Sequence, residues 1–331
     1  MSTVAPERIL KELADLWVTL GQESGAGEGS AGAGVLRSCS MTMVVIAEAS
    51  EDPAALGETI AALMPEHPAR TIVIRLSGAG ERALSERVYA QCWRPFGQHQ
   101  QICCEQVEIT ASDAALADVS SVVRPLAVAD LPLIVWCRSA RLAAMPEFAE
   151  IAGMASKVIV DTTGQPDPAA ALRRLADSSR AGLALGDLAW TRLTRWRETL
   201  AQVFENREHA ARLGQIGRVA VEFSPELATS AYYMAAWVAD ALKEAGARLS
   251  AVEVLPGPYL HVELAGEGLS VILQRRDGRF SLVLNGAVRP LNLPPPDDYF
   301  LMREELAIAR RDPVFEKALA SAARLAYPTD K

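Results

Sequence analysis

Two continuous apolar runs in the first half of the chain limit the folds that it can adopt. Met41–Ala47 (MTMVVIA) and Thr71–Leu76 (TIVIRL) place apolar side chains at mostly successive positions rather than at alternate ones. Such runs are typical of strands that are buried on both faces, as in a parallel sheet covered by helices. Asp52 and Pro53 predict a helix start between them, because aspartate is a good N-cap and proline suits the first helical turn. The first half is therefore predicted to be an α/β domain.

The alternation of strands and helices continues to about residue 180. Arg87–Arg94 and Gln101–Thr110 have the pattern of two extended segments joined across a turn, which predicts an antiparallel insertion in a mostly parallel sheet. A helix that begins at Asp113 is expected to end before Pro125, because the residue before a proline resists the helical conformation. We therefore expect a mostly parallel α/β sandwich. The other elements are strands at Leu133–Trp136 and Lys157–Val160 and a helix at 168–176.

The pattern changes after about residue 180, and the second half is predicted to be an α+β domain with an antiparallel sheet. Ser224-Pro225-Glu226 supplies an N-cap, a proline and an acidic residue in order, so a long helix is expected to follow the strand Arg218–Phe223. Asp277-Gly278 is a strong hairpin signal. The extended segments lie at about 249–255, 258–264, 269–276 and 279–285, and a last helix begins at Asp312-Pro313.

The N-terminal region adds a helix and a glycine-rich linker. Residues 4–20 have an amphipathic helical pattern, and residues 23–34 have the composition of a flexible linker. The linker contains G-x-G-x-x-G at Gly27, Gly29 and Gly32, but this motif binds dinucleotides only when it follows a strand and opens a helix. Here it follows a helix and precedes a strand, so we interpret it as coincidental. The predicted domains are 1–34, 35–180 and 181–331.

The charge and composition of the chain exclude several classes of protein. The 331 residues carry a net charge of −8, whereas nucleic-acid binding requires a basic face. No run of about 18 or more apolar residues occurs, so no membrane span is expected. The N-terminus lacks the apolar core of a signal peptide, which predicts a cytoplasmic location. The five cysteines are odd in number and include no Cys-x-x-Cys pair, so a disulfide framework is not expected.

Metal-binding residues are scarce in the sequence. Cys92, His99, Cys103 and Cys104 are of types that bind zinc, but neighbouring residues of a strand point to opposite faces, so Cys103 and Cys104 cannot both be ligands. We predict neither a metal nor a cofactor. The cysteines are interpreted as buried side chains, with a redox role left open.

His67 and Arg70 are the candidate contacts for an anion. They lie on a predicted loop between a helix and a strand, a place where α/β proteins often bind ligands. A histidine next to prolines is more often structural, which is the alternative interpretation. No recognised catalytic motif accompanies them, so the chain is predicted not to be an enzyme.

The segment Gly186–Arg197 combines a helix start with tryptophan and arginine side chains. Asp187 is a good N-cap, and apolar residues recur after it at three- and four-residue spacing. Arg192 and Arg197 flank this apolar stripe and Trp190 lies at its edge, while Arg195 points away from it. Tryptophan and arginine are enriched at interface hot spots, so Trp190, Arg192 and Arg195 are the candidate partner-binding residues. The alternative is an ordinary packed helix with solvated arginines.

Four short motifs follow one another between about residues 40 and 245. They are HPAR at 67–70, CCEQ at 103–106, RPL at 124–126 with DLP at 130–132, and DLAWTRL at 187–193. Together they resemble the OpcA family, the glucose-6-phosphate dehydrogenase assembly proteins, which are also described as a subunit of that enzyme.

The resemblance implies a noncatalytic assembly factor and allosteric activator that binds glucose-6-phosphate dehydrogenase, at the entry to the oxidative pentose phosphate pathway. Redox control, which is associated with cyanobacterial members, is not carried over, because the chain has no cysteine after Cys137. Two alternatives stay open. One is a sugar-phosphate-binding sensor or enzyme that uses His67 and Arg70, and the other is a scaffold that uses the Trp/Arg helix to bind a different partner.

Overall fold

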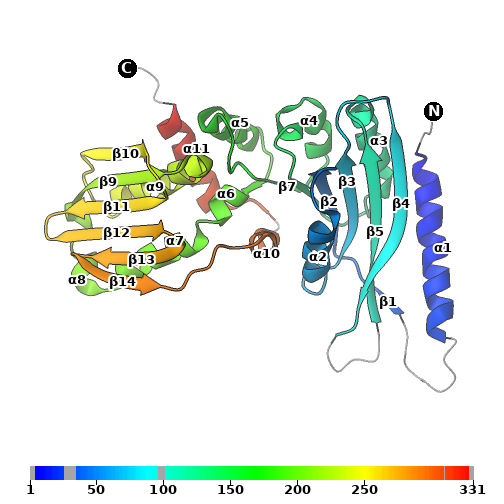
Figure 1. Cartoon of the computed structure of the whole chain (residues 1–331), viewed down its shortest axis with the longest axis horizontal. Coiled ribbons are helices and arrows are strands. Elements are labelled where there is room, and N and C mark those ends of the chain that lie inside the picture. The colour runs from blue at the N-terminus through cyan, green and yellow to red at the C-terminus, as the bar shows by residue number, and fades with distance from the viewer. Residues whose placement is uncertain (1–3, 26–34, 96–100, 309, 328–331) are drawn as a thin grey trace. The chain divides into compact units, whose positions relative to one another are not determined.

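The structure of the chain is a computed structural model, which describes residues 4–25, 35–95, 101–308 and 310–327 (Figure 1). The glycines of the predicted linker, Gly27, Gly29 and Gly32, lie outside the described residues, and so does the candidate ligand His99. Within the described part of the chain, no helix is both long enough and apolar enough to cross a membrane.

The chain divides into two compact units. Unit 1 consists of Met1–Val160 and Asp298–Arg310, and unit 2 consists of Asp161–Asp297 and Arg311–Lys331. This division falls earlier than the boundary at 180 that the sequence pattern predicts. A short segment near the C-terminus, Asp298–Arg310, also belongs to unit 1.

The strands of unit 1 belong to a mostly parallel sheet, in which they lie in the order β1-β5-β3-β2-β6-β7 and β4 pairs with β5. β2 pairs in parallel with β3 on one side and with β6 on the other, so both of its edges are covered. All eight residues of β3 are buried, as the continuous apolar run predicts. The strands are β1 (Val35–Arg37), β2 (Met41–Glu48), β3 (Ala69–Leu76), β4 (Leu84–Trp93), β5 (Gln101–Ala111), β6 (Leu133–Cys137) and β7 (Lys157–Val160).

One helix of unit 1, α2, begins at the N-cap that the sequence predicts. Asp52 accepts a hydrogen bond from the Ala54 amide at 2.9 Å and starts α2. α3 runs through Pro125 to Leu126, so the prediction that it ends before Pro125 is wrong. A proline in the last turn removes one backbone N–H donor, but few helical hydrogen bonds remain to be formed after it. The helices are α1 (Pro6–Gly25), α2 (Pro53–Leu63), α3 (Leu116–Leu126), α4 (Glu147–Ala152) and α10 (Asp298–Ala307).

A buried lysine joins α10 to the rest of unit 1. Lys157 is 1% exposed, and its Nζ forms an ion pair with Glu305 Oε2 at 2.7 Å. The same Nζ donates to the carbonyl oxygens of Glu305 at 2.8 Å and Ile308 at 2.9 Å. A buried ammonium group requires such partners, and here they come from residues far along the chain. This contact explains why the segment 298–310 belongs to unit 1.

The predicted antiparallel insertion is confirmed as the β4–β5 hairpin, and it contains a disulfide. The register places Cys92 directly opposite Cys103, with 4.1 Å between their Cα atoms, and the two sulfurs are bonded. The expectation of a chain without disulfides is therefore corrected. Cys104 and Cys137 are buried free thiols, and burial raises their pKa to about 11 and about 12, respectively. These two fit the expectation of inert buried cysteines.

Unit 2 contains a second sheet with the strand order β10-β9-β11-β12-β13-β14. It is mixed rather than wholly antiparallel, because β9 and β10 pair in parallel. The long helix α9 connects these two strands, and a helical crossover returns the chain in the same direction. The strands of this sheet are β9 (Ile216–Phe223), β10 (Ala251–Pro256), β11 (His261–Gly266), β12 (Leu269–Arg276), β13 (Arg279–Leu284) and β14 (Ala287–Leu291). Unit 2 also contains the short strand β8 (Leu185–Asp187), which is not part of this sheet.

The helices of unit 2 build its core around three aromatic rings. Trp190, Tyr233 and Phe315 contact one another with ring centroids 5.8 to 6.0 Å apart. Asp312 caps the last helix as predicted, accepting from the Val314 amide at 2.8 Å. The helices are α5 (Pro168–Arg180), α6 (Leu188–Thr191), α7 (Thr194–Val203), α8 (Arg207–Ala210), α9 (Ala228–Glu244) and α11 (Pro313–Ala326).

Candidate functional site

The segment Gly186–Arg197 is organised around the buried carboxylate of Asp187. Oδ1 accepts from the amides of Ala189 at 3.0 Å and Thr162 at 3.1 Å. Oδ2 accepts from Thr162 Oγ1 at 2.6 Å and from the Tyr233 hydroxyl at 2.9 Å. Burial raises the pKa of Asp187 to about 6, although the hydrogen bonds from Thr162 and Ala189 act in the opposite direction. Asp187 therefore joins β8, α6 and α9 and has no access to a ligand from solvent.

Trp190 belongs to the core of unit 2 rather than to the edge of a surface patch. Its side chain is 3% exposed, and the Arg197 guanidinium lies over its ring at 3.6 Å from the centroid. The sequence pattern assumes one continuous helix from Asp187, whereas the helix is interrupted between Thr191 and Thr194. All four residues of the short helix α6 are buried, so Trp190 does not lie at the edge of an exposed face.

The two candidate arginines have different surroundings. Arg192 makes a two-point ion pair with Asp161, with both distances at 2.8 Å, and it also donates to Thr163 Oγ1 at 2.9 Å. Its half-buried side chain thus stabilises the turn that follows residue 160. Arg195 is 57% exposed in its side chain and pairs with Glu198 at 3.1 Å. Of the three candidate partner-binding residues, Arg195 is the one that presents an exposed side chain.

Arg70 has an inward-facing guanidinium rather than a ligand-facing one. Its side chain is buried, and Nε donates to Glu105 Oε2 at 2.5 Å while Nη1 donates to the Leu126 carbonyl at 2.8 Å. His67 lies at a partly buried position before β3, and burial lowers its pKa. The predicted anion contact therefore lacks its cation, because the Arg70 charge is already paired.

Glu105 is the centre of a buried polar cluster in unit 1. Besides Arg70, its carboxylate accepts from the Trp17 indole at 2.5 Å and pairs with Arg37 at 2.6 Å. These bonds join α1, β1, β3 and β5. The CCEQ motif at 103–106 thus contributes a structural carboxylate.

The carboxyl edge of the unit 1 sheet, where α/β proteins often bind ligands, is occupied by ion pairs. Arg138 pairs with Glu51 at 2.6 Å and with Asp298 at 2.5 Å. Arg141 pairs with Glu48 at 3.1 Å and with Asp113 at 2.7 Å.

The first turn at this edge, between β2 and α2, also lacks the features that hold a phosphate group. It carries the carboxylates of Glu48, Glu51 and Asp52, and Asp52 already caps the helix N-terminus. A phosphate at this position would meet like charge instead of free N–H groups. Across the described ranges, no group of three or more histidine, cysteine or acidic side chains is placed to hold a metal ion.

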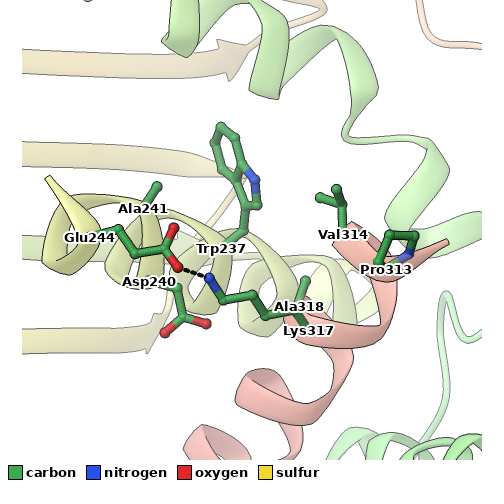
Figure 2. Close-up of a pocket in the computed structure, with 8 residues that line it drawn as sticks. All are labelled: Trp237, Asp240, Ala241, Glu244, Pro313, Val314, Lys317 and Ala318. Carbon is green, nitrogen blue, oxygen red and sulfur yellow. Dashed lines mark hydrogen bonds and ion pairs between the residues drawn. The ribbon is translucent and has the colours of Figure 1, made fainter.

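Trp237 on α9 is more accessible than Trp190, and it lies near residues of α11 in unit 2 (Figure 2). Trp237 is partly exposed, and Val314 beside it is 51% exposed. Figure 2 shows Trp237 projecting from α9 with the acidic residues of the next turn nearby, and an ion pair joins Glu244 to Lys317. We call this region the Trp237 surface. It surrounds a hollow of about 240 Å³ lined by Trp237, Asp240, Ala241, Glu244, Pro313, Val314, Lys317 and Ala318.

The Trp237 surface is not apparent from the sequence pattern. The apolar residues at helical spacing here are Leu227, just before α9, and Ala231, Met234, Val238 and Leu242 within it, and Trp237 lies off this face. A single tryptophan outside an apolar stripe was the available signal. Its neighbours Pro313 and Val314 come from α11, and sequence spacing does not reveal that α9 and α11 pack together.

Two family models match the chain. One, described as the N-terminal domain of the glucose-6-phosphate dehydrogenase subunit, matches residues 60–177. The other, described as the C-terminal domain of that subunit, matches residues 183–319.

Curated relatives from cyanobacteria match part of the chain. A protein of Nostoc punctiforme is 27% identical over 180 residues, which are 54% of this chain and 38% of the relative. A protein of Synechocystis is 26% identical over 189 residues, 57% of this chain and 39% of the relative. Both carry the provisional name OxPP cycle protein OpcA. This chain thus matches less than half the length of either relative.

The solved structures to which this chain shows a weak similarity include oxidoreductases. Biliverdin reductase from Synechocystis is 9% identical with a TM-score of 0.44, and the match covers 85% of this chain and 97% of that one. A 3-ketoreductase from Actinomadura kijaniata is 11% identical with a TM-score of 0.48, covering 86% and 95%, respectively. Neither similarity assigns an activity to this chain. The family models, in contrast, match both halves of the sequence, and the chain belongs to the OpcA family of glucose-6-phosphate dehydrogenase subunits.

Proposed function

We propose that this chain is a noncatalytic subunit that binds glucose-6-phosphate dehydrogenase and favours its active oligomeric state. The observation that carries the proposal is the match of both halves of the chain to the domains of a subunit of that enzyme. A binding protein can shift an oligomeric equilibrium only when it has a higher affinity for one state than for the other. The proposed action is therefore selective binding to the active oligomer.

The state of the chemically reactive side chains supports a noncatalytic role. Asp187 is 0% exposed and accepts four hydrogen bonds from neighbouring groups. Arg70 and Glu105 neutralise each other in the interior of unit 1. A general base or an anion contact must reach its substrate, and these groups do not. Asp187 stabilises the interior of unit 2, and the Arg70–Glu105 pair stabilises the interior of unit 1.

The Trp237 surface is the part of unit 2 that we propose for docking. A partly exposed tryptophan beside an exposed valine offers apolar area that a partner can cover, and tryptophan is enriched at interface hot spots. Asp240 adds negative charge to its rim, whereas the charge of Glu244 is offset by its ion pair with Lys317. The complementary partner segment would carry an apolar side chain flanked by lysine or arginine. Arg195, which is exposed on α7, remains a second proposed contact, and the variant Arg195→Glu tests it.

Replacing Trp237 with alanine should weaken binding to the cognate dehydrogenase by about 30- to 1000-fold, because hot-spot truncations cost about 2–4 kcal/mol. Because Trp237 is partly exposed, its replacement should lower the free energy of unfolding less than the replacement of a fully buried tryptophan would. The dissociation constant should be measured by biolayer interferometry with the complete dehydrogenase. Val288→Ala is the control, since Val288 is 66% exposed on β14 and lies outside the Trp237 surface. It should bind like the wild type.

Arg195→Glu separates the two proposed contacts. If Trp237→Ala binds normally while Arg195→Glu binds more weakly than the wild type, the docking surface lies on α7 and the assignment of the Trp237 surface is refuted. Both variants must retain the wild-type melting temperature for this comparison.

A further inference from the structure

Four arginines surround one cavity in unit 2. The cavity has a volume of about 550 Å³ and lies beside α5 and α11. Arg173 and Arg180 come from α5, Arg324 comes from α11, and Arg311 precedes α11. Among the described residues that line the cavity, Glu316 is the one acidic residue. In a chain with a net charge of −8, this arrangement concentrates positive charge at one place. We call it the arginine cavity.

Two of these arginines already have carboxylate partners. Arg311 pairs with Glu316 and also donates to the Ser179 carbonyl at 3.1 Å. Arg180 pairs with Asp177 on the preceding turn of α5. The charges of these two side chains are therefore largely offset within the protein.

The described contacts of the other two arginines include no direct ion pair. The Arg173 guanidinium lies over the Tyr327 ring, 4.8 Å from the centroid. Arg324 donates to Ser321 Oγ at 2.8 Å, and this hydroxyl in turn donates to Asp240 Oδ2 at 2.6 Å. A ring face and a hydroxyl hold a guanidinium in place without neutralising its charge. Arg173 on α5 and Arg324 on α11 are thus held in place, and the positive charge of each guanidinium can attract an anion.

The rest of the lining leaves room for a ligand with an uncharged part. Ala176, Ala320 and Ala323 line the cavity with small side chains, and Tyr327 is 47% exposed. The volume lies within the range of about 300–1000 Å³ that is typical of small-molecule sites. Arginine is the preferred side chain for phosphate groups, because its planar guanidinium donates two parallel hydrogen bonds.

We infer that the arginine cavity binds a small phosphorylated molecule. Arg173 and Arg324 bind its phosphate groups, and the Tyr327 ring contacts the part of the molecule that carries them. This site is distinct from the predicted anion contact at His67 and Arg70, and it does not depend on binding to the dehydrogenase.

Isothermal titration calorimetry of the full chain with inorganic pyrophosphate and with ATP tests this inference. Both probes should bind the wild type, and the affinity should fall as salt is raised. The double variant Arg173→Gln/Arg324→Gln should lose at least about tenfold in affinity for each probe. A higher affinity for ATP would identify a nucleotide-like ligand, whereas equal affinities would show that the phosphate groups alone are recognised.

Arg276→Gln is the matched control, because Arg276 is 68% exposed next to the β12–β13 turn, outside the cavity. It should bind both probes like the wild type. The inference is overturned if neither probe binds the wild type, or if the double variant binds as tightly with an unchanged melting temperature. Binding of a hexaglutamate peptide in place of both probes would also overturn it, in favour of an acidic protein segment.

Discussion

Replacing Asp187 with alanine is expected to lower the free energy of unfolding by about 3–5 kcal/mol, because several buried donors lose their acceptor at once. The carboxylate accepts from two backbone amides and from the hydroxyls of Thr162 and Tyr233, all in the interior of unit 2. An alanine at this position supplies no acceptor and leaves no path for water. Urea unfolding followed by tryptophan fluorescence gives the free energy. A loss below about 1 kcal/mol would contradict the structural role assigned to Asp187.

The conservative variant Asp187→Asn separates the charge of this side chain from its hydrogen bonds. The folded-state pKa of Asp187 is raised to about 6, above its ordinary value of 3.8, so the folded chain keeps this proton to higher pH than the unfolded chain does. This group therefore contributes stability at low pH that is lost as the pH rises from about 4 to about 6, by up to about 3 kcal/mol. The asparagine variant should lack this part of the pH dependence.

Replacing Lys157 with alanine is expected to cost about 3–5 kcal/mol of unfolding free energy, because the Glu305 carboxylate stays buried without its cation. Lys157 is 1% exposed and also serves the carbonyls of Glu305 and Ile308. The change should release α10 from unit 1, so limited proteolysis should cleave near residues 298–310 in the variant and not in the wild type.

The double variant Lys157→Met/Glu305→Leu is the control for that experiment. Replacing both members of a buried ion pair by apolar residues of similar size is often nearly neutral, whereas removing one member is not. The double variant should therefore be more stable than Lys157→Ala. If it is less stable than the single variant, the cost arises from lost packing and not from an unpaired charge.

The parts of the fold that depend on local sequence could be predicted. The buried strands β2 and β3 follow from continuous apolar runs, and the helix starts at Asp52 and Asp312 follow from capping chemistry. Contacts between distant segments could not be predicted in the same way. Lys157 and Glu305 are separated by 148 residues, and no local pattern links them.

The candidate site also depends on contacts between distant segments that the sequence pattern does not predict. Asp187 is identified as an N-cap from sequence, but its burial depends on Thr162 and Tyr233, which come from other elements. Trp190 is misplaced by the pattern because α6 is buried at all four of its positions and has no exposed edge. The Cys92–Cys103 disulfide depends on the register of β4 against β5, which the spacing of cysteines does not specify.

The most direct test of the proposed function is the effect of this chain on its cognate glucose-6-phosphate dehydrogenase. Sedimentation velocity and initial rates should be measured on the same samples, with the chain titrated from zero to excess. The account predicts a saturable shift to a larger oligomer together with a higher kcat/KM, both reduced in Trp237→Ala and unchanged in Val288→Ala. An oligomeric state and kinetic constants that stay the same at saturating concentrations of the chain would contradict it.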